Sequence, residues 1–196
     1  GKFFNAGQTC VAPDYVLVEA SVREALLQKL KDVVTEFYGS DPQRSPDFAR
    51  VVNTKHHDRL TKLLEGQNAY VGGEHDRATK YIAPTILTDV DPKSPIMQEE
   101  IFGPVLTMIP FKDEDEALQI ANDVRYGLAA YLWTSAVGRA HRIAQAVEAG
   151  MVWVNSENVR HLPTPFGGTK SSGIGRDGGD YGLDCYMETK HIAISF

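Results

Sequence analysis

A regular alternation of strand-like and helix-like segments between residues 105 and 155 is the feature that most limits how this chain can fold. Three apolar, β-rich segments, "VLTMIPF", "GLAAYLWT" and "GMVWVN", are separated by two segments with helical spacing, 113–125 and 136–149. Strands that alternate with helices through short connections lie parallel in a sheet, with the helices packed on its faces. The sequence therefore predicts an α/β fold with a mostly parallel sheet flanked by helices.

The preceding residues extend this pattern. A β-rich run at 14–20 is followed by Ser21 and Glu24, which have the spacing of a capping box, and apolar residues then recur at helical spacing as far as Tyr38. We therefore expect a strand and then a helix. Further elements are expected at 54–64 (helix) and within 69–73 and 80–87 (short strands).

The last ten residues, "METKHIAISF", are typical of a strand at the edge of a sheet. An exposed edge presents unpaired backbone groups that invite pairing with another chain. We therefore predict a C-terminal edge strand and a homo-oligomer that forms through it.

Composition excludes several classes of partner. The net charge of −6 opposes binding to nucleic acid or to an anionic membrane surface. No apolar run reaches the length of about 18 residues that a membrane span needs, and the first residues lack the pattern of a signal peptide. The two cysteines, Cys10 and Cys185, lie far apart in the sequence and are expected to stay reduced. These features favour a cytoplasmic protein with no nucleic-acid or membrane partner.

The chain has no initiator Met, and Cys10 arrives before a first supersecondary unit is complete. We therefore expect an excised domain or the tail of a longer protein.

Cys10 lies in "FFNAGQTCVAPDYVLV", among small and polar residues directly before a β-rich segment. A cysteine used for packing usually sits within apolar residues, because the free thiol behaves as a small hydrophobic group. A reactive thiolate instead needs exposure and hydrogen-bond donors nearby for the oxyanion that it creates. Both interpretations, an inert packing thiol and a nucleophile, stay open on this residue alone.

Two other segments contain groups that could take part in chemistry. In "MQEEIFGPVL", Glu99 and Glu100 precede a turn, where one carboxylate could face a ligand with several hydroxyl groups. The glycine-rich segment "TPFGGTKSSGIGRDGG" contains the glycine spacing of a dinucleotide fingerprint, but only a terminal strand follows it, so that match is interpreted as false. No metal site is predicted, because the adjacent His56 and His57 face apart on a helix.

Taken together, these motifs resemble the aldehyde dehydrogenase superfamily, and specifically its catalytic domain. "FNAGQTC" is similar to the nucleophile motif, "EEIFGPV" to the segment that holds the nicotinamide ribose, and "GMVWVN" and "PFGGTKSSGIGR" to the strand and loop beside the substrate tunnel. The motifs occur in the family's order over nearly the whole chain. The resemblance implies an aldehyde dehydrogenase-like catalytic domain over 1–196.

The resemblance assigns roles to individual residues. It implies that Cys10 attacks the aldehyde, that Glu100 binds the ribose of NAD or NADP, and that Phe102 packs beside the nicotinamide. It also implies that Phe166 lines the substrate tunnel and that Asn155 is structural.

Arg160 and His161 could in addition bind a substrate carboxylate, since a guanidinium fork matches carboxylate geometry. A surface arginine is the alternative for Arg160.

Part of the family's machinery has no counterpart in this sequence. The family's general base, in a Glu-Leu-Gly-Gly type motif, its asparagine oxyanion donor and its N-terminal cofactor-binding domain all precede the nucleophile motif. We therefore expect NAD or NADP to be bound mainly by a domain not present here, and turnover by the chain alone to be inefficient. The alternatives are an isolated non-catalytic folding or oligomerisation domain, and a residual cysteine esterase.

The resemblance changes along the chain. The front part is most similar to class 3 aldehyde dehydrogenases, and the tail to dehydrogenases of carboxymethyl-hydroxymuconate semialdehyde. A chimera, an engineered domain or a natural branch of the family would each combine the two.

Overall fold

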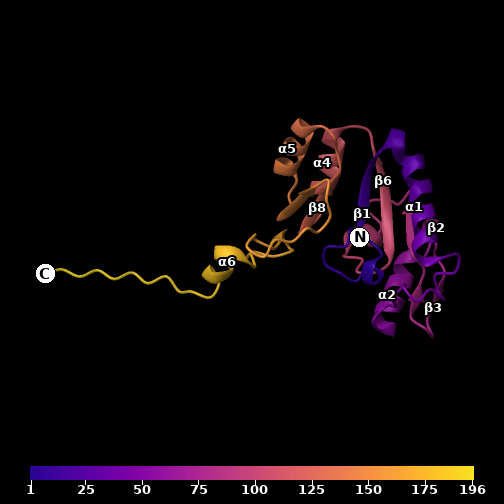
Figure 1. The fold of residues 1–196 in the computed structure, drawn as a ribbon, viewed down its shortest axis with the longest axis horizontal. Helices are drawn as coiled ribbons and strands as arrows, with labels where there is room; N and C mark the ends of the chain where they lie inside the picture. The colour runs from indigo at the N-terminus through magenta and orange to yellow at the C-terminus, as the bar shows by residue number, and fades with distance from the viewer. The chain divides into compact units, whose positions relative to one another are not determined.

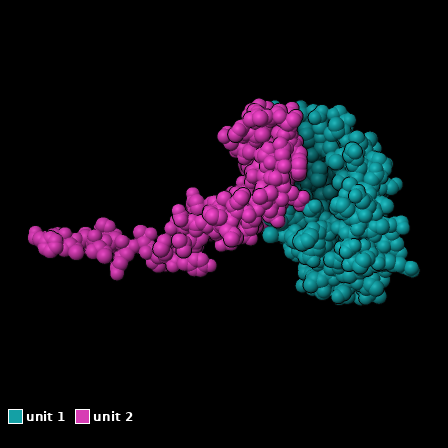
Figure 2. Space-filling model, viewed as in Figure 1, with its two compact units in different colours: residues 1–119 teal, residues 120–196 magenta.

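The computed structural model describes residues 1–196 (Figure 1). The chain divides into two compact units, residues 1–119 and residues 120–196, which are coloured separately in Figure 2. Helix α4 (Glu114–Asn122) contains the boundary between them. Each unit is described by itself.

The first unit is built on a four-stranded sheet in the order β1-β6-β5-β2. Its strands are β1 (Tyr15–Glu19), β2 (Asn68–Val71), β5 (Thr85–Thr88) and β6 (Val105–Phe111). Strand β6 pairs in parallel with both β1 and β5, whereas β2 pairs antiparallel with β5. The central strands, β5 and β6, are buried along most of their length because both faces of the sheet are covered.

Two helices, α1 (Arg23–Tyr38) and α2 (Thr54–Leu64), cover opposite faces of this sheet. Successive side chains of a strand point to opposite faces. Ile86 of β5 accordingly packs in one buried cluster with Leu27 of α1, and the next residue, Leu87, packs in another with Leu60 of α2. The first unit is thus a sheet between two helical layers.

The remaining elements of the first unit are short and lie mainly in connections. They are the 3₁₀ turns η1 (Phe4–Gly7) and η2 (Ala20–Val22), the strands β3 (His75–Asp76) and β4 (Tyr81–Ile82), and helix α3 (Pro95–Gln98). Strands β3 and β4 pair antiparallel with each other.

The second unit contains two small sheets and two helices. Strand β8 (Ala129–Leu132) pairs in parallel with β9 (Met151–Val154), and helix α5 (Val137–Ala146) connects them. Strand β7 (Tyr126–Gly127) pairs antiparallel with β10 (Thr169–Lys170), and α6 (Gly179–Asp184) is the last helix. None of the helices in the chain combines the length and apolar character needed to cross a membrane.

The structure confirms the α/β fold class and reproduces the expected helix at 54–64 and strand at 105–111 without change. Two local expectations are wrong. Helix α1 has no capping box, because the Ser21 hydroxyl donates to Glu19 at 2.8 Å and no side chain caps the helix. Residues 187–196 form no strand and are exposed throughout, since a strand needs a partner and none lies beside this segment.

Candidate active site

The backbone directly before Cys10 has an unusual conformation. Asn5, Ala6 and Gly7, within η1, have φ angles of 50°, 52° and 72°. For residues other than glycine this left-handed region costs roughly 1–2 kcal/mol each, so it persists only where the surrounding structure imposes it. Burial of Ala6 in a cluster with Phe48 and Tyr81 supplies part of that constraint. The loop is therefore held in one shape rather than left free.

The Gln8 side chain supplies a further constraint. Its amide nitrogen donates to the carbonyl oxygens of Asn5 and Arg50, each at 3.0 Å, and its amide oxygen accepts the Val52 N–H at 2.9 Å. Gln8 thus fastens the loop to a segment more than 40 residues further along the chain. Sequence reasoning did not single it out, because Arg50 and Val52 take part through backbone atoms that leave no signature in the sequence.

Cys10 itself is a free, exposed cysteine. It follows Thr9, whose carbonyl accepts the Ala12 N–H at 3.0 Å in a turn that leads to β1. The position differs from that of a packing thiol, which would be enclosed by apolar side chains.

The loop of Cys10 packs directly on the turn that contains Glu100. A Cβ atom added to Gly7 would lie 2.1 Å from the carbonyl oxygen of Gly103, far inside van der Waals contact. Only glycine permits this approach. The structure therefore brings together the "FNAGQTC" and "EEIFGPV" motifs, which are about 90 residues apart in the sequence.

The two acids of the second motif have different surroundings. Arg59 of α2 donates to the carbonyl oxygens of Glu100 and Ile101, at 3.3 and 2.5 Å, and lies 3.9 Å from the Glu99 carboxylate. This arginine fixes the backbone of the turn and forms an ion pair with Glu99. The Glu100 residue is exposed, and no hydrogen bond to its carboxylate is seen.

Neighbouring charges shift the pKa of Glu100 in both directions. Partial burial and then the Asp14 carboxylate raise the pKa of Glu100, whereas Arg59 and Lys2 lower it. Phe102, two residues on, has a φ of 47° and is 38% exposed, so its ring is presented on the surface instead of filling the core.

In the second unit, two of the residues predicted for substrate binding lie together. Phe166 and Asp177 exchange two backbone hydrogen bonds of 2.7 Å. The Arg160 guanidinium lies 4.5 Å from the centre of the Phe166 ring and 3.3 Å from the Asp177 carboxylate. His161 is exposed, and its carbonyl accepts hydrogen bonds from the N–H and hydroxyl of Thr164.

Close backbone packing anchors the loop of Phe166, and the Asn155 side chain connects the segments that follow β8 and β9. A Cβ atom on Gly150, directly before β9, would lie 2.1 Å from the Gly167 carbonyl oxygen. The Asn155 side chain exchanges two hydrogen bonds with the backbone of Thr134, at 2.8 and 2.9 Å. Asn155 therefore has a structural role, joining the ends of β8 and β9.

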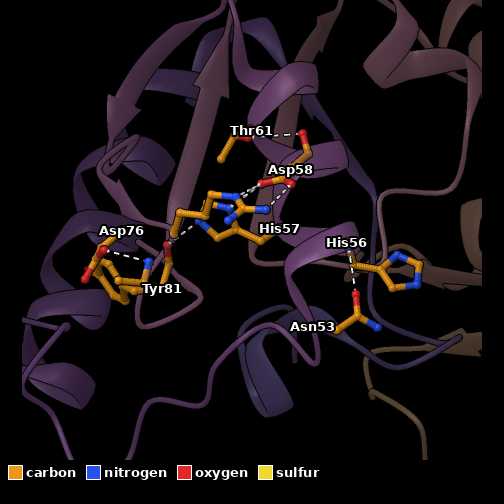
Figure 3. Close-up of polar contacts among 9 residues, drawn as sticks. Asn53, His56, His57, Asp58, Thr61, Asp76 and Tyr81 are labelled. Atoms are coloured by element: carbon orange, nitrogen blue, oxygen red, sulfur yellow. Dashed lines mark hydrogen bonds and ion pairs between the residues drawn. The ribbon is translucent and has the colours of Figure 1, made fainter.

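His56 and His57 lie among structural contacts of α2 (Figure 3). The two side chains leave α2 in different directions, and His57 is buried with its Nε2 atom 3.1 Å from the Tyr81 carbonyl oxygen. Its Nδ1 atom faces Asp58 at 3.6 Å, and Asp58 in turn forms a two-pronged ion pair with Arg77. No group of three or more His, Cys, Asp or Glu side chains could hold a metal ion.

Comparison with known proteins identifies the family. Residues 1–192 match the family described as "Aldehyde dehydrogenase family". The chain belongs to this family. The resemblance found in the sequence is thereby confirmed.

Individual relatives show how much of such an enzyme this chain represents. Rat aldehyde dehydrogenase family 3 member A2 is 46% identical over 193 residues, which is 97% of this chain and 40% of that protein. Bovine "Aldehyde dehydrogenase, dimeric NADP-preferring" is 44% identical over 178 residues, 89% of this chain and 74% of that sequence. The chain thus spans about 40% of the length of the first of these relatives.

Solved structures of similar proteins have the same fold as this chain. A substrate-bound AldH from Staphylococcus aureus superposes with a TM-score of 0.88 and 38% identity, over 99% of this chain and 45% of that one. An NADP-dependent enzyme from E. coli has a TM-score of 0.90 and 33% identity, over 100% of this chain and 42% of that one.

Proposed function

We propose that residues 1–196 are the nucleophile-bearing catalytic domain of an NAD(P)-dependent aldehyde dehydrogenase that oxidises an aldehyde or semialdehyde to a carboxylate. The observation that carries this proposal is the exposed Cys10 thiol at the end of a constrained loop that packs on the turn of Glu100. Family membership supplies the reaction class.

Cys10 is the proposed nucleophile. Its thiolate attacks the aldehyde carbon and forms a C–S bond, giving a thiohemiacetal whose oxyanion accepts a hydrogen bond from the Cys10 backbone N–H. Loss of one such donor typically raises a barrier by about 3–4 kcal/mol. Loss of hydride from that carbon leaves a thioester, and addition of water to the thioester releases the carboxylate and regenerates the thiol.

The bound cofactor would accept the hydride. Glu100 and Phe102 fit such a group, because an exposed carboxylate can accept hydrogen bonds from ribose hydroxyls and an exposed ring can pack beside a nicotinamide. One relative is named NADP-preferring, and a similar solved structure, a betaine aldehyde dehydrogenase from Staphylococcus aureus, is described in complex with NAD+. We propose that most of the cofactor's binding surface lies outside residues 1–196.

Phe166, Arg160 and His161 are proposed to face the substrate. Arg160 already has the Asp177 carboxylate as a partner. A substrate carboxylate would take the place of Asp177, and the stacking of the guanidinium on Phe166 would hold the fork in position. A preference for semialdehydes that carry a carboxylate follows from this arrangement.

Two further proposals concern the chain as a whole. Without the family's general base, the thioester on Cys10 should persist, so the chain alone should be acylated but turn over poorly.

Pairing of two copies through residues 187–196 is supported by the exposure of Ile192, Ile194 and Phe196, which alternate as in a strand, and by the description of one relative as dimeric.

A residual esterase is a second candidate function, because the exposed Cys10 thiol could attack activated esters even without a cofactor. A non-catalytic folding or oligomerisation module is the third. Acylation of the chain separates the module from both enzymes, and reduction of NAD(P)+ separates the dehydrogenase from the esterase.

The test compares Cys10→Ser with Cys185→Ser, since both cysteines are exposed. Treated with p-nitrophenyl acetate, the chain should release one equivalent of nitrophenol in a burst, and intact mass should show one acetyl group on Cys10. Cys10→Ser should lose the burst and Cys185→Ser should keep it. Equal labelling of the two variants would contradict the proposed nucleophile.

Dehydrogenase activity is measured on a complete enzyme, made by joining the chain to the cofactor-binding part of the rat relative. Formation of NAD(P)H, followed by absorbance, should depend on Cys10. An enzyme that binds cofactor and is acylated at Cys10 but never reduces NAD(P)+ would favour the esterase.

A further inference from the structure

An ion pair between a buried lysine and a partly buried aspartate lies near the candidate cofactor carboxylate. The Lys2 ammonium is 3.5 Å from the Asp14 carboxylate, and only 4% of the Lys2 side chain and 32% of the Asp14 side chain are exposed. Burying a lysine is costly, because the charged group loses its water. Burial accordingly lowers the pKa of Lys2 and raises that of Asp14, and the partner opposes the shift in each case.

The pair connects the two motifs of the first unit. The Lys2 carbonyl lies against Gly7, where an added Cβ atom would be 3.1 Å from it, so Lys2 belongs to the base of the nucleophile loop. The backbone N–H of Ile101, the residue after Glu100, lies close enough to the Asp14 carboxylate to lower its pKa. The Asp14 carbonyl accepts the Thr107 N–H of β6 at 3.2 Å. Asp14 thus links β1, β6 and the turn of Glu100.

We propose that Lys2 and Asp14 form a positioning pair for Glu100, which fixes the turn and balances the charge near it so that the Glu100 carboxylate can receive a cofactor hydroxyl. This inference rests on the proposed role of Glu100 in cofactor binding.

The charges around Glu100 make this role distinguishable from a merely structural one. Lys2 and Arg59 are the cations that lower the pKa of Glu100, and Asp14 is the anion that raises it, while Glu99 is paired with Arg59. Removal of the Lys2 charge and removal of the Asp14 charge should therefore shift the pKa of Glu100 in opposite directions. A mere loss of packing would give no reason for the pKa of Glu100 to shift in opposite directions in the two variants.

The first experiment is an NMR titration of the 196-residue chain labelled with 13C at its glutamate carboxyl groups, with Glu100 assigned from Glu100→Gln. Lys2→Met should raise the pKa of Glu100, Asp14→Asn should lower it, and Lys2→Arg should leave it close to that of the parent chain. The double variant, Lys2→Met with Asp14→Asn, should lie between the single variants. It also keeps the test informative if Lys2→Met alone fails to fold, because it leaves no unpaired buried charge.

The second experiment uses the complete enzyme. Lys2→Met should raise the KM for NAD(P)+ several-fold with a smaller change in kcat, and Lys2→Arg should restore it. Unchanged KM values and a Glu100 pKa that shifts the same way in both single variants would overturn the inference.

Failure of the proposed function has a separate signature. If acylation of Cys10 and NAD(P)+ reduction are both absent in the parent enzyme, the function is wrong. The opposite pKa shifts would still show that the pair sets the charge at Glu100.

Discussion

At the scale of single residues, three of the five non-glycine residues with positive φ in the first unit lie beside the candidate chemistry. Asn5 and Ala6 lie before Cys10 and Phe102 lies after Glu100, and all three have positive φ angles although none is glycine. Such residues persist where neighbouring contacts fix them. Here those contacts are the hydrogen bonds of Gln8 and Arg59 and the close approach of Gly7 to Gly103. The strain is thus a consequence of placing two loops in direct contact.

Gly7→Ala tests that contact. We expect a loss of roughly 1–2 kcal/mol from the left-handed backbone and about 1–3 kcal/mol more from overpacking against Gly103. Gly66→Ala is the matched control, because Gly66 has nearly the same φ, 73° against 72°, but nothing within 4 Å of an added Cβ atom. Urea unfolding of the two variants gives the difference. Equal losses would show that the approach of the loops contributes nothing.

Asp58→Asn tests an exposed ion pair through its pH dependence. Hydrogen bonds from Arg77 hold the pKa of Asp58 below its usual value. The stabilisation is therefore present above the unfolded-state pKa and is lost as the pH falls through the lowered, folded-state pKa. We expect the parent chain to exceed Asp58→Asn slightly in stability at neutral pH and to lose that advantage in acid. Urea unfolding across this range measures it, and an advantage that grows on acidification would contradict the assignment.

At the scale of elements, the core explains why the helices and strands could be predicted. Helix α2 follows the expected residues because its buried side chains recur at helical spacing, and strand β6 does so because it is a nearly continuous apolar run that the core buries. The start of α1 was misplaced, because Ser21 and Glu24 have the right spacing but Ser21 bonds to Glu19 instead. A cap depends on backbone geometry that spacing alone does not determine.

Asn53→Ala and Ser21→Ala test the two helix starts. Asn53 accepts the His56 N–H at 2.9 Å and caps α2, as Figure 3 shows. Its loss should cost about 1 kcal/mol. Ser21→Ala should change stability by less than about 0.5 kcal/mol, since Ser21 makes no cap to α1. Thermal or urea unfolding compares them, and a larger effect at Ser21 would restore the capping box.

At the scale of the whole molecule, the candidate site residues are divided between two compact units. Cys10, Glu100 and Phe102 belong to residues 1–119, and Arg160 and Phe166 belong to residues 120–196. The chain also ends in an exposed apolar segment, 187–196, which the fold of a single copy does not use. A single copy therefore leaves part of its apolar sequence without a covering surface.

Removal of residues 187–196 separates folding from association. The shortened chain should keep the free energy of unfolding of a single copy, because the deleted residues are exposed and belong to no element. Sedimentation velocity should show the full chain associating and the shortened chain remaining a monomer. Association that survives the deletion would place the interface elsewhere.

The sequence by itself determined the fold class, most of the elements and the identity of the main candidate residues. Local periodicity and motif order suffice for these, because hydrophobic spacing and short motifs are written in neighbouring residues. Only the tertiary structure showed that Gln8 fastens the nucleophile loop, that Lys2 is buried against Asp14 and that Arg160 is already paired with Asp177. Each of these contacts joins residues that are 12 or more positions apart. Such a contact exists only once folding has brought the two residues together.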